Sequence, residues 1–150
     1  LGGAAVLVAA HSVPACEAVA TIGGPAEPAH VTRHLLSNAE EIGREGEATV
    51  LLAGRPFKIK KQFLQDIEKS RMEKLIATLR RALLICHAPR DQIVGIDNAA
   101  HIFQAARHPK SFLSLADADH LLTDERDSRY VGAMIASWAR RYIRRPTTDY

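Results

Sequence analysis

The 150-residue sequence predicts an α/β fold built on a small parallel sheet. Residues 82–86 are continuously apolar, which is typical of a parallel strand buried on both faces, and residues 111–116 form a second strand that we also expect to be buried. Helical patterns precede and follow these strands, and such alternation favours a parallel sheet covered by helices. A hydrophobic content of 47% with 25% charged residues fits a globular domain.

The first sixty residues are expected to supply a helix, a strand and a hairpin. Residues 1–10 are small and apolar, as in a helix packed on all sides. Residues 17–22 form an apolar run that ends at a Gly-Gly-Pro break, which indicates a buried strand. Residues 25–46 are expected to be loop, with a short helix at 31–42. Two β-rich runs, at 48–53 and 57–60, flank a Gly/Pro turn and predict the hairpin.

The remaining elements are mainly helices. Residues 61–80 predict an amphipathic helix, and residues 96–107 and 127–144 predict the helices that follow the two C-terminal strands. The apolar stripe of the last helix, which is expected to face the core, comprises Val131, Met134, Ile135, Trp138 and Tyr142. Because this makes only about three parallel strands, we expect further strands upstream of Leu1. We therefore also expect the 150 residues by themselves to associate, for example as a homodimer.

Polar residues follow both C-terminal strands, in the loops 87–94 and 116–122. One strand–helix–strand unit separates these loops, so they become neighbours at the carboxyl edge of the sheet. A carboxylate beside an imidazole fixes the tautomer of the ring and stabilises its protonated form. Asp91 alone is more simply explained as a helix cap, but the paired loop that contains His120 favours an acid–histidine pair.

Other residues compete for roles at this edge. Asp97 and Asp119 are alternatives for the acid; we expect Asp97 to cap the following helix and Asp119 to point elsewhere. His87, at the end of its strand, is a candidate supporting or pocket residue.

These loops resemble a known family. The pattern P-x-D-x-x-V at residues 89–94 and A-D-H at residues 118–120 are similar to the acid and histidine loops of α/β-hydrolases. The start of the chain, L-G-G-A-A, resembles the residues that follow the serine of that family's G-x-S-x-G-G elbow. The resemblance covers essentially all 150 residues and implies an incomplete α/β-hydrolase fold that begins just after the nucleophile.

The resemblance implies an esterase-like serine hydrolase that works through an acyl-enzyme. His120 would be the general base and then the general acid, Asp91 would orient it, and the backbone N–H of Leu1 would donate to the oxyanion. The nucleophile would lie upstream, so the chain by itself is expected to be inactive. Segment 54–80 corresponds to the cap that shapes the substrate pocket. A small ester or similar acyl compound is the expected substrate, with no cofactor and no metal.

A subgroup is also indicated. The stretches G-R-P-F-K-I at 54–59, D-Q-I-V-G-I-D-N-A at 91–99 and H-P-K-S-F at 108–112 resemble the hydrolase half of α/β-hydrolase/OsmC fusion proteins. The alternative function is a non-catalytic accessory or binding domain on the same fold, fused to an OsmC-like redox domain. The residue before Leu1 would discriminate: serine favours an esterase, aspartate a dehalogenase, and a small inert residue the binding domain.

Composition disfavours several other classes. The net charge of +3 comes without a basic face rich in aromatic residues, which disfavours nucleic-acid binding. No apolar run reaches the roughly 18 residues of a membrane span. Cys16 and Cys86 lack metal or redox spacing and are expected to be buried free thiols, as in a cytoplasmic protein. His30 and His34 have a spacing that can bind a metal on a helix, but no third ligand is evident.

Overall fold

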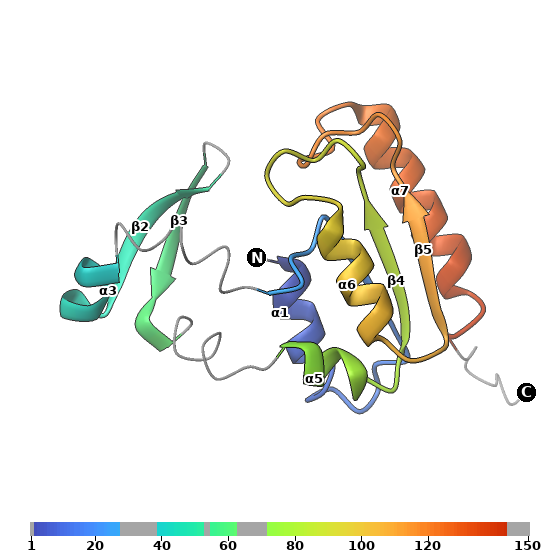
Figure 1. Cartoon of the computed structure of the whole chain (residues 1–150), viewed down its shortest axis with the longest axis horizontal. Coiled ribbons are helices and arrows are strands. Elements are labelled where there is room, and N and C mark those ends of the chain that lie inside the picture. The colour runs from blue at the N-terminus through green and yellow to red at the C-terminus, as the bar shows by residue number, and fades with distance from the viewer. Residues whose placement is uncertain (1, 28–38, 53–54, 63–71, 144–150) are drawn as a thin grey trace, which may run out of the picture.

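A three-stranded parallel sheet in the order β1-β4-β5 forms the centre of the molecule (Figure 1). The computed structural model describes residues 2–27, 39–52, 55–62 and 72–143. The sheet comprises β1 (Ala18–Ile22), β4 (Ala82–His87) and β5 (Lys110–Ser114). Its helices are α1 (Gly2–Ala9), α5 (Met72–Ala77), α6 (Asp97–Ala105) and α7 (Glu125–Ala139). In Figure 1, α1, α5 and α6 cover one face of the sheet and α7 covers the other, so the predicted α/β architecture is confirmed.

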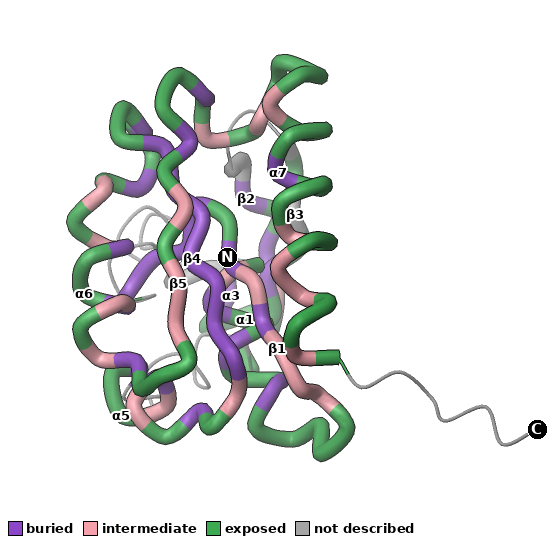
Figure 2. Tube along the Cα trace, turned by 90° about the vertical axis from the view of Figure 1, so that its right-hand side faces the viewer, coloured by how far each residue is buried: buried purple, intermediate pink, exposed green. Residues whose placement is uncertain are grey.

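Strand β4 is the buried centre of this sheet, as predicted from its apolar run. Every residue of β4 is buried, and Figure 2 shows it as a continuous buried segment between its neighbours. Leu83 and Ile85 pack into the core under α1, α5 and α6, whereas Leu84 and Cys86 pack toward α7. The alternation of side chains along one strand thus supplies both layers of the core.

Strand β5 is less buried than expected: none of its residues is buried, so the prediction of a second buried strand is wrong. Phe112 is 46% exposed, because β5 pairs with β4 alone among the described strands and its other edge is open. The indole N–H of Trp138 donates to the hydroxyl of Ser111 at 3.2 Å and attaches α7 to this strand.

Helix α1 is also more exposed than expected. Ala4 and Leu7 are buried against β1 and α5, but Val6 and Val8 are 38% and 39% exposed. The expectation of a helix packed on all sides is therefore wrong for this structure. Among the described elements, the main neighbours of α1 are β1 and α5.

Helix α7 begins two residues before its predicted start because Asp124 caps it. The Asp124 side chain accepts a hydrogen bond from the backbone N–H of Arg126 at 2.8 Å, which satisfies one of the free donors of the first turn. On the predicted apolar stripe, Val131 is 2% exposed and lies in the core, but Met134 is 38% exposed, so its assignment to the core was wrong.

The hairpin lies to one side of the sheet (Figure 1). It comprises α3 (Ala39–Glu45), β2 (Glu47–Leu52) and β3 (Arg55–Lys60), and the antiparallel pairing of β2 with β3 confirms the predicted hairpin. Its small core contains Ile42, Ala48, Val50 and Ile59.

Two helix predictions near the hairpin were only partly tested. The helix expected at 31–42 coincides with α3 only at its end, and residues 31–38 lie outside the described residues. Of the amphipathic helix expected at 61–80, residues 63–71 also lie outside. In the described remainder, residues 61–62 are helical, and the short α5 covers 72–77 with Met72 and Ile76 buried. No helix among the described residues is both long and apolar enough to cross a membrane.

Candidate active site

The loops that follow β4 and β5 bring Asp91 and His120 into direct contact. The Nδ1 atom of His120 lies 2.7 Å from Oδ2 of Asp91. Because the carboxylate can only accept, Nδ1 carries the proton and donates it to this hydrogen bond. The Asp91 side chain is 1% exposed, whereas that of His120 is 22% exposed, so the pair joins a buried acid to a partly accessible ring. No described residue forms a hydrogen bond with Nε2 of His120, which leaves this atom for a reacting group.

Asp91 is held by its own loop. Its other carboxylate oxygen, Oδ1, accepts hydrogen bonds from the backbone N–H groups of Ile93 and Val94, both at 2.9 Å. A side chain that binds the backbone two and three residues later is typical of the Asx turns that aspartate forms. Oδ1 therefore fixes the loop, and Oδ2 faces His120.

The same contacts keep Asp91 charged. Burial of the side chain raises its pKa, but the hydrogen bonds from Val94, His120 and Ile93 outweigh that effect, and the pKa lies below the ordinary value of 3.8. Near neutral pH the side chain is a carboxylate. A carboxylate in this position stabilises the imidazolium that forms when His120 takes a proton.

The Asp119 side chain constrains the turn that follows His120. Oδ1 of Asp119 accepts from the backbone N–H of Leu121 at 2.9 Å and of Thr123 at 3.1 Å, and Oδ2 accepts from the Thr123 hydroxyl. These hydrogen bonds lower the pKa of Asp119, and the bond from the Thr123 hydroxyl has the largest effect. Leu122 within this turn has φ +51°, a conformation that costs a residue with a side chain about 1 kcal/mol. Asp119 thus points away from the ring, as expected, and shapes the turn after it.

Asp97 is neither the acid that pairs with His120 nor the cap of α6. It is exposed in the first turn of α6, and the cap position belongs to Ile96, which makes no side-chain hydrogen bond there. The prediction that Asp97 caps the helix was wrong. His87 is fully buried at the end of β4, and this excludes the role of a pocket-lining residue while leaving that of a supporting one.

Gly23 is a site residue that the sequence analysis missed. It follows β1 with φ +54°, and a Cβ built on it would lie 3.1 Å from Nδ1 of His120 and 3.3 Å from Oδ2 of Asp91. Its N–H donates to the carbonyl of Cys86 at 3.0 Å, which fixes its backbone to β4. The Gly-Gly-Pro sequence indicated only the end of a strand. The role of Gly23 could have been predicted, because the strand expected at 17–22 ends at the same edge of the sheet as the two polar loops.

The start of α1 lies beside the same glycine pair. A Cβ on Gly3 would come within 2.8 Å of the Cα atom of Gly24, a distance that real Cβ atoms essentially never show. The first turn of α1 therefore lies against the residue that follows Gly23. Leu1 lies outside the described residues, so its role as an oxyanion donor stays a prediction.

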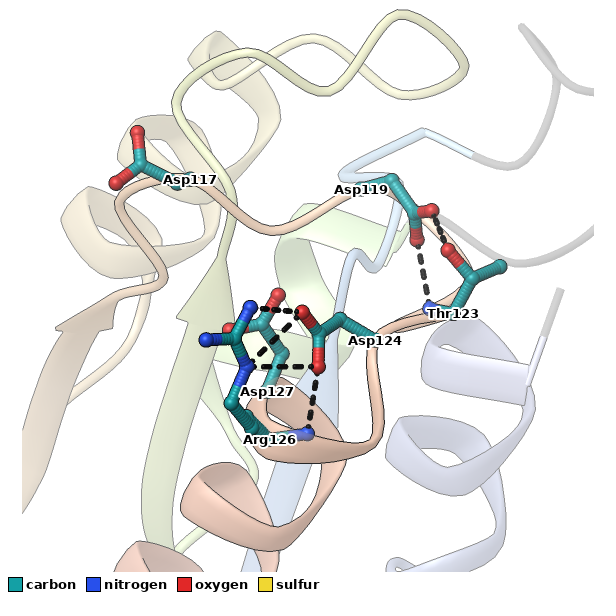
Figure 3. Close-up of a pocket in the computed structure, with 6 residues that line it drawn as sticks. All are labelled: Asp117, Asp119, Thr123, Asp124, Arg126 and Asp127. Atoms are coloured by element: carbon teal, nitrogen blue, oxygen red, sulfur yellow. Dashed lines mark hydrogen bonds and ion pairs between the residues drawn. The ribbon is translucent and has the colours of Figure 1, made fainter.

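An acidic hollow of about 500 Å³ opens beside the start of α7 (Figure 3). It is lined by Asp117, Asp119, Thr123, Asp124, Arg126 and Asp127. Figure 3 shows the Asp124 carboxylate bound to Arg126, and hydrogen bonds from Arg126 lower the pKa of Asp124 to about 2. Since Asp119 is bound to Thr123 in the same way, capping and turn contacts account for these two acids.

The described part of the chain contains no group of three or more histidine, cysteine, aspartate or glutamate side chains able to hold a metal ion. His30 and His34, the spaced pair considered for metal binding, lie outside these residues. Cys86 is buried and Cys16 half-buried, and both are free thiols.

Several solved structures are similar to this chain. No protein-family model and no curated protein matches the sequence. The esterase domain of a Rhodothermus marinus protein is 51% identical, with a TM-score of 0.82, and the match covers 96% of this chain and 59% of that one.

More distant structures share the fold. Alpha/beta hydrolase domain-containing protein 10 from mouse is 20% identical with a TM-score of 0.64, and the match covers 93% of this chain and 58% of that one. Est1E from Butyrivibrio proteoclasticus is 16% identical with a TM-score of 0.58, over 93% of this chain and 57% of that one. The chain thus spans less than two thirds of the length of each of these proteins.

Proposed function

The chain belongs to the α/β-hydrolase superfamily, and we therefore propose that it supplies the acid and the histidine of an esterase-like serine hydrolase. The observation that carries the proposal is the 2.7 Å contact between Nδ1 of His120 and Oδ2 of Asp91, with Nε2 of the ring unbound by any described residue. The substrate class is a small ester or similar acyl compound. The R. marinus esterase domain, at 51% identity, supports this class.

The proposed reaction uses the ring of His120 twice. Nε2 first takes the proton of the nucleophilic hydroxyl as its oxygen bonds to the substrate carbonyl carbon, and then gives that proton to the leaving alcohol oxygen as the ester bond breaks. Water repeats the sequence and releases the acid from the acyl-enzyme. Throughout, Asp91 keeps Nδ1 protonated and offsets the positive charge on the ring.

The nucleophile is proposed to be a serine directly before Leu1 in a longer protein. The packing of Gly3 against Gly24 supports this position, because it places the first turn of α1 beside the Asp91–His120 pair. The backbone N–H of Leu1 would then donate to the oxyanion, a contribution on the order of 3 kcal/mol to transition-state stabilisation. The positive end of the helix dipole would add to it.

Segment 54–80 is proposed to be the cap over the substrate pocket. It includes β3 and α5 and lies in sequence between β1 and the acid strand β4. Of the hairpin, which has a small core of its own and stands to one side of the sheet (Figure 1), only β3 belongs to this segment. Fusion to an OsmC-like domain, a homodimer and a cytoplasmic location stay predictions.

The test is hydrolysis of a short p-nitrophenyl ester by a longer protein in which the proposed serine and its upstream residues precede this chain. His120→Ala should abolish most of the activity, whereas His101→Ala, which removes an exposed histidine of α6, should leave it unchanged. Equal activity of the two variants would show that His120 is not the base. The identity of the residue before Leu1 separates esterase from dehalogenase chemistry in the same protein.

A further inference from the structure

The side chain of His87 forms a hydrogen bond across the loop that contains Asp91, here called the acid loop. His87 is the last residue of β4 and is 0% exposed. Its Nε2 lies 2.8 Å from the carbonyl oxygen of Val94. A carbonyl oxygen only accepts, so Nε2 carries a proton and donates it. This single bond joins the two ends of the loop that contains Asp91.

The acid loop, which this hydrogen bond closes, also sets the orientation of the Asp91 carboxylate. The N–H of Val94 donates to Oδ1 of Asp91 at 2.9 Å, while its carbonyl accepts from His87. Nε2 of His87 also lies 3.7 Å from Oδ2 of Asp91, the oxygen that binds His120. Moving the Val94 peptide would therefore turn the carboxylate relative to the ring of His120.

The backbone of His87 connects the acid loop to the histidine loop. Its carbonyl accepts from the N–H of Leu115 at 2.9 Å, just beyond the end of β5 and five residues before His120. The neighbouring carbonyl of Cys86 accepts from the N–H of Gly23, where an added Cβ would lie 3.1 Å from Nδ1 of His120. His87 is thus at the point where the three segments of the site join.

We propose that His87 is a positioning residue of the proposed hydrolase site, whose Nε2–H bond to Val94 holds Asp91 in register with His120. The inference rests on the proposed function for its kinetic consequence, but the hydrogen-bond geometry that it explains is independent of the nucleophile. His87 is fully buried and does not touch substrate. A histidine that merely filled the core would have no effect on Asp91 beyond general stability.

Three substitutions separate the two roles. In His87→Gln the amide nitrogen takes the place of Nε2 and can still donate to Val94. In His87→Asn the amide is too short to reach this carbonyl. Since a buried amide without a partner can prevent folding, His87→Leu serves as a second variant that lacks the donor and buries no polar group. Cys86→Ala is the matched control, because Cys86 is equally buried beside His87 but faces α7.

The first readout is the low-field NMR resonance of the His120 Nδ1 proton, assigned by its loss in His120→Ala. We expect wild type, His87→Gln and Cys86→Ala to show it, and His87→Asn and His87→Leu to lose or shift it. The second readout is ester hydrolysis by the longer protein, in which the variants without the donor should lose about 10²-fold in kcat with KM unchanged. The Gln variant should recover most of that loss.

Two results would overturn the proposal. One is a His120 resonance and kcat in His87→Asn and His87→Leu that match those of Cys86→Ala. The other is an equal loss in His87→Gln, which would mean that the donor to Val94 is not what matters. If wild type hydrolyses no ester, the proposed function fails, while the resonance still decides whether His87 positions the pair.

Discussion

Gly23 packs so closely against His120 that a single added carbon would lie 3.1 Å from Nδ1 and 3.2 Å from Cε1 of the ring. Its φ of +54° is in the left-handed region that glycine adopts without strain. Two independent requirements, a backbone conformation and a lack of room, thus select glycine at the end of β1. The loop after this strand forms one wall of the Asp91–His120 pair.

Gly23→Ala should therefore lower kcat strongly and the free energy of unfolding only modestly. The left-handed conformation costs alanine roughly 1–2 kcal/mol in unfolding free energy, and the Cβ must displace the ring or the carboxylate by a few tenths of an ångström. We expect kcat for ester hydrolysis to fall by at least about tenfold, because catalysis is sensitive to small misplacements. Urea unfolding and initial rates measure the two effects.

Gly95→Ala is the control for this prediction, since a Cβ there meets nothing within 4 Å and its φ is not positive. It should change neither quantity appreciably. Equal kcat values for the two alanine variants would refute the steric argument.

Asp91→Asn tests the charge on the buried acid through pH. The folded-state pKa of Asp91 is lowered from 3.8, so its ionised form stabilises the fold above that pH, and the contribution is lost as the pH falls through the folded value. The asparagine variant has no such contribution. The difference in unfolding free energy between the two proteins, from urea titrations, should shrink as the pH falls below 3.8. A difference that widened over this acidic interval would mean that the pKa is raised.

Asp119→Ala should loosen the turn that presents His120. It removes the acceptor of the Leu121 and Thr123 backbone N–H groups, which hold Leu122 at its positive φ. We expect a lower kcat with little change in KM, and partial recovery in Asp119→Asn, which keeps one acceptor oxygen. Asp117→Ala, an exposed neighbour in the same loop, is the comparison. A full wild-type rate in Asp119→Ala would exclude this role.

The two thiols should differ in reactivity. Burial raises the pKa of Cys86 to about 11, so at pH 8 only about one molecule in a thousand carries its thiolate. Iodoacetamide should label the half-buried Cys16 first in the native protein, and both residues in urea. Mass spectrometry of time points distinguishes the sites. Early labelling of Cys86 would contradict its buried position.

The sequence predicted those parts of the fold that follow from local patterns. The apolar run of β4, the hairpin, and the succession of strands and helices were all evident from residue types. The pairing of Asp91 with His120 followed from topology, because the carboxyl ends of neighbouring parallel strands meet at one edge. Their roles in catalysis were implied by the resemblance and stay to be tested by experiment.

What could not be predicted depended on contacts across the fold. The exposure of Phe112 follows from the edge position of β5, which an apolar run does not reveal. Met134 lies on the same helical stripe as Val131 but is 38% exposed, whereas Val131 is 2% exposed. Gly23 was read only as a strand break, because its role depends on a ring nearly one hundred residues later in the chain.

The most direct test of the account is a double-mutant cycle of Asp91→Asn, His120→Ala and the combined variant in the longer protein, measured as kcat for a p-nitrophenyl ester. If the two side chains work as one unit, His120→Ala should lose about 10⁶-fold and the added Asp91→Asn should cost little more. Losses that multiply in the double variant, or a His120→Ala variant with the wild-type rate, would contradict it.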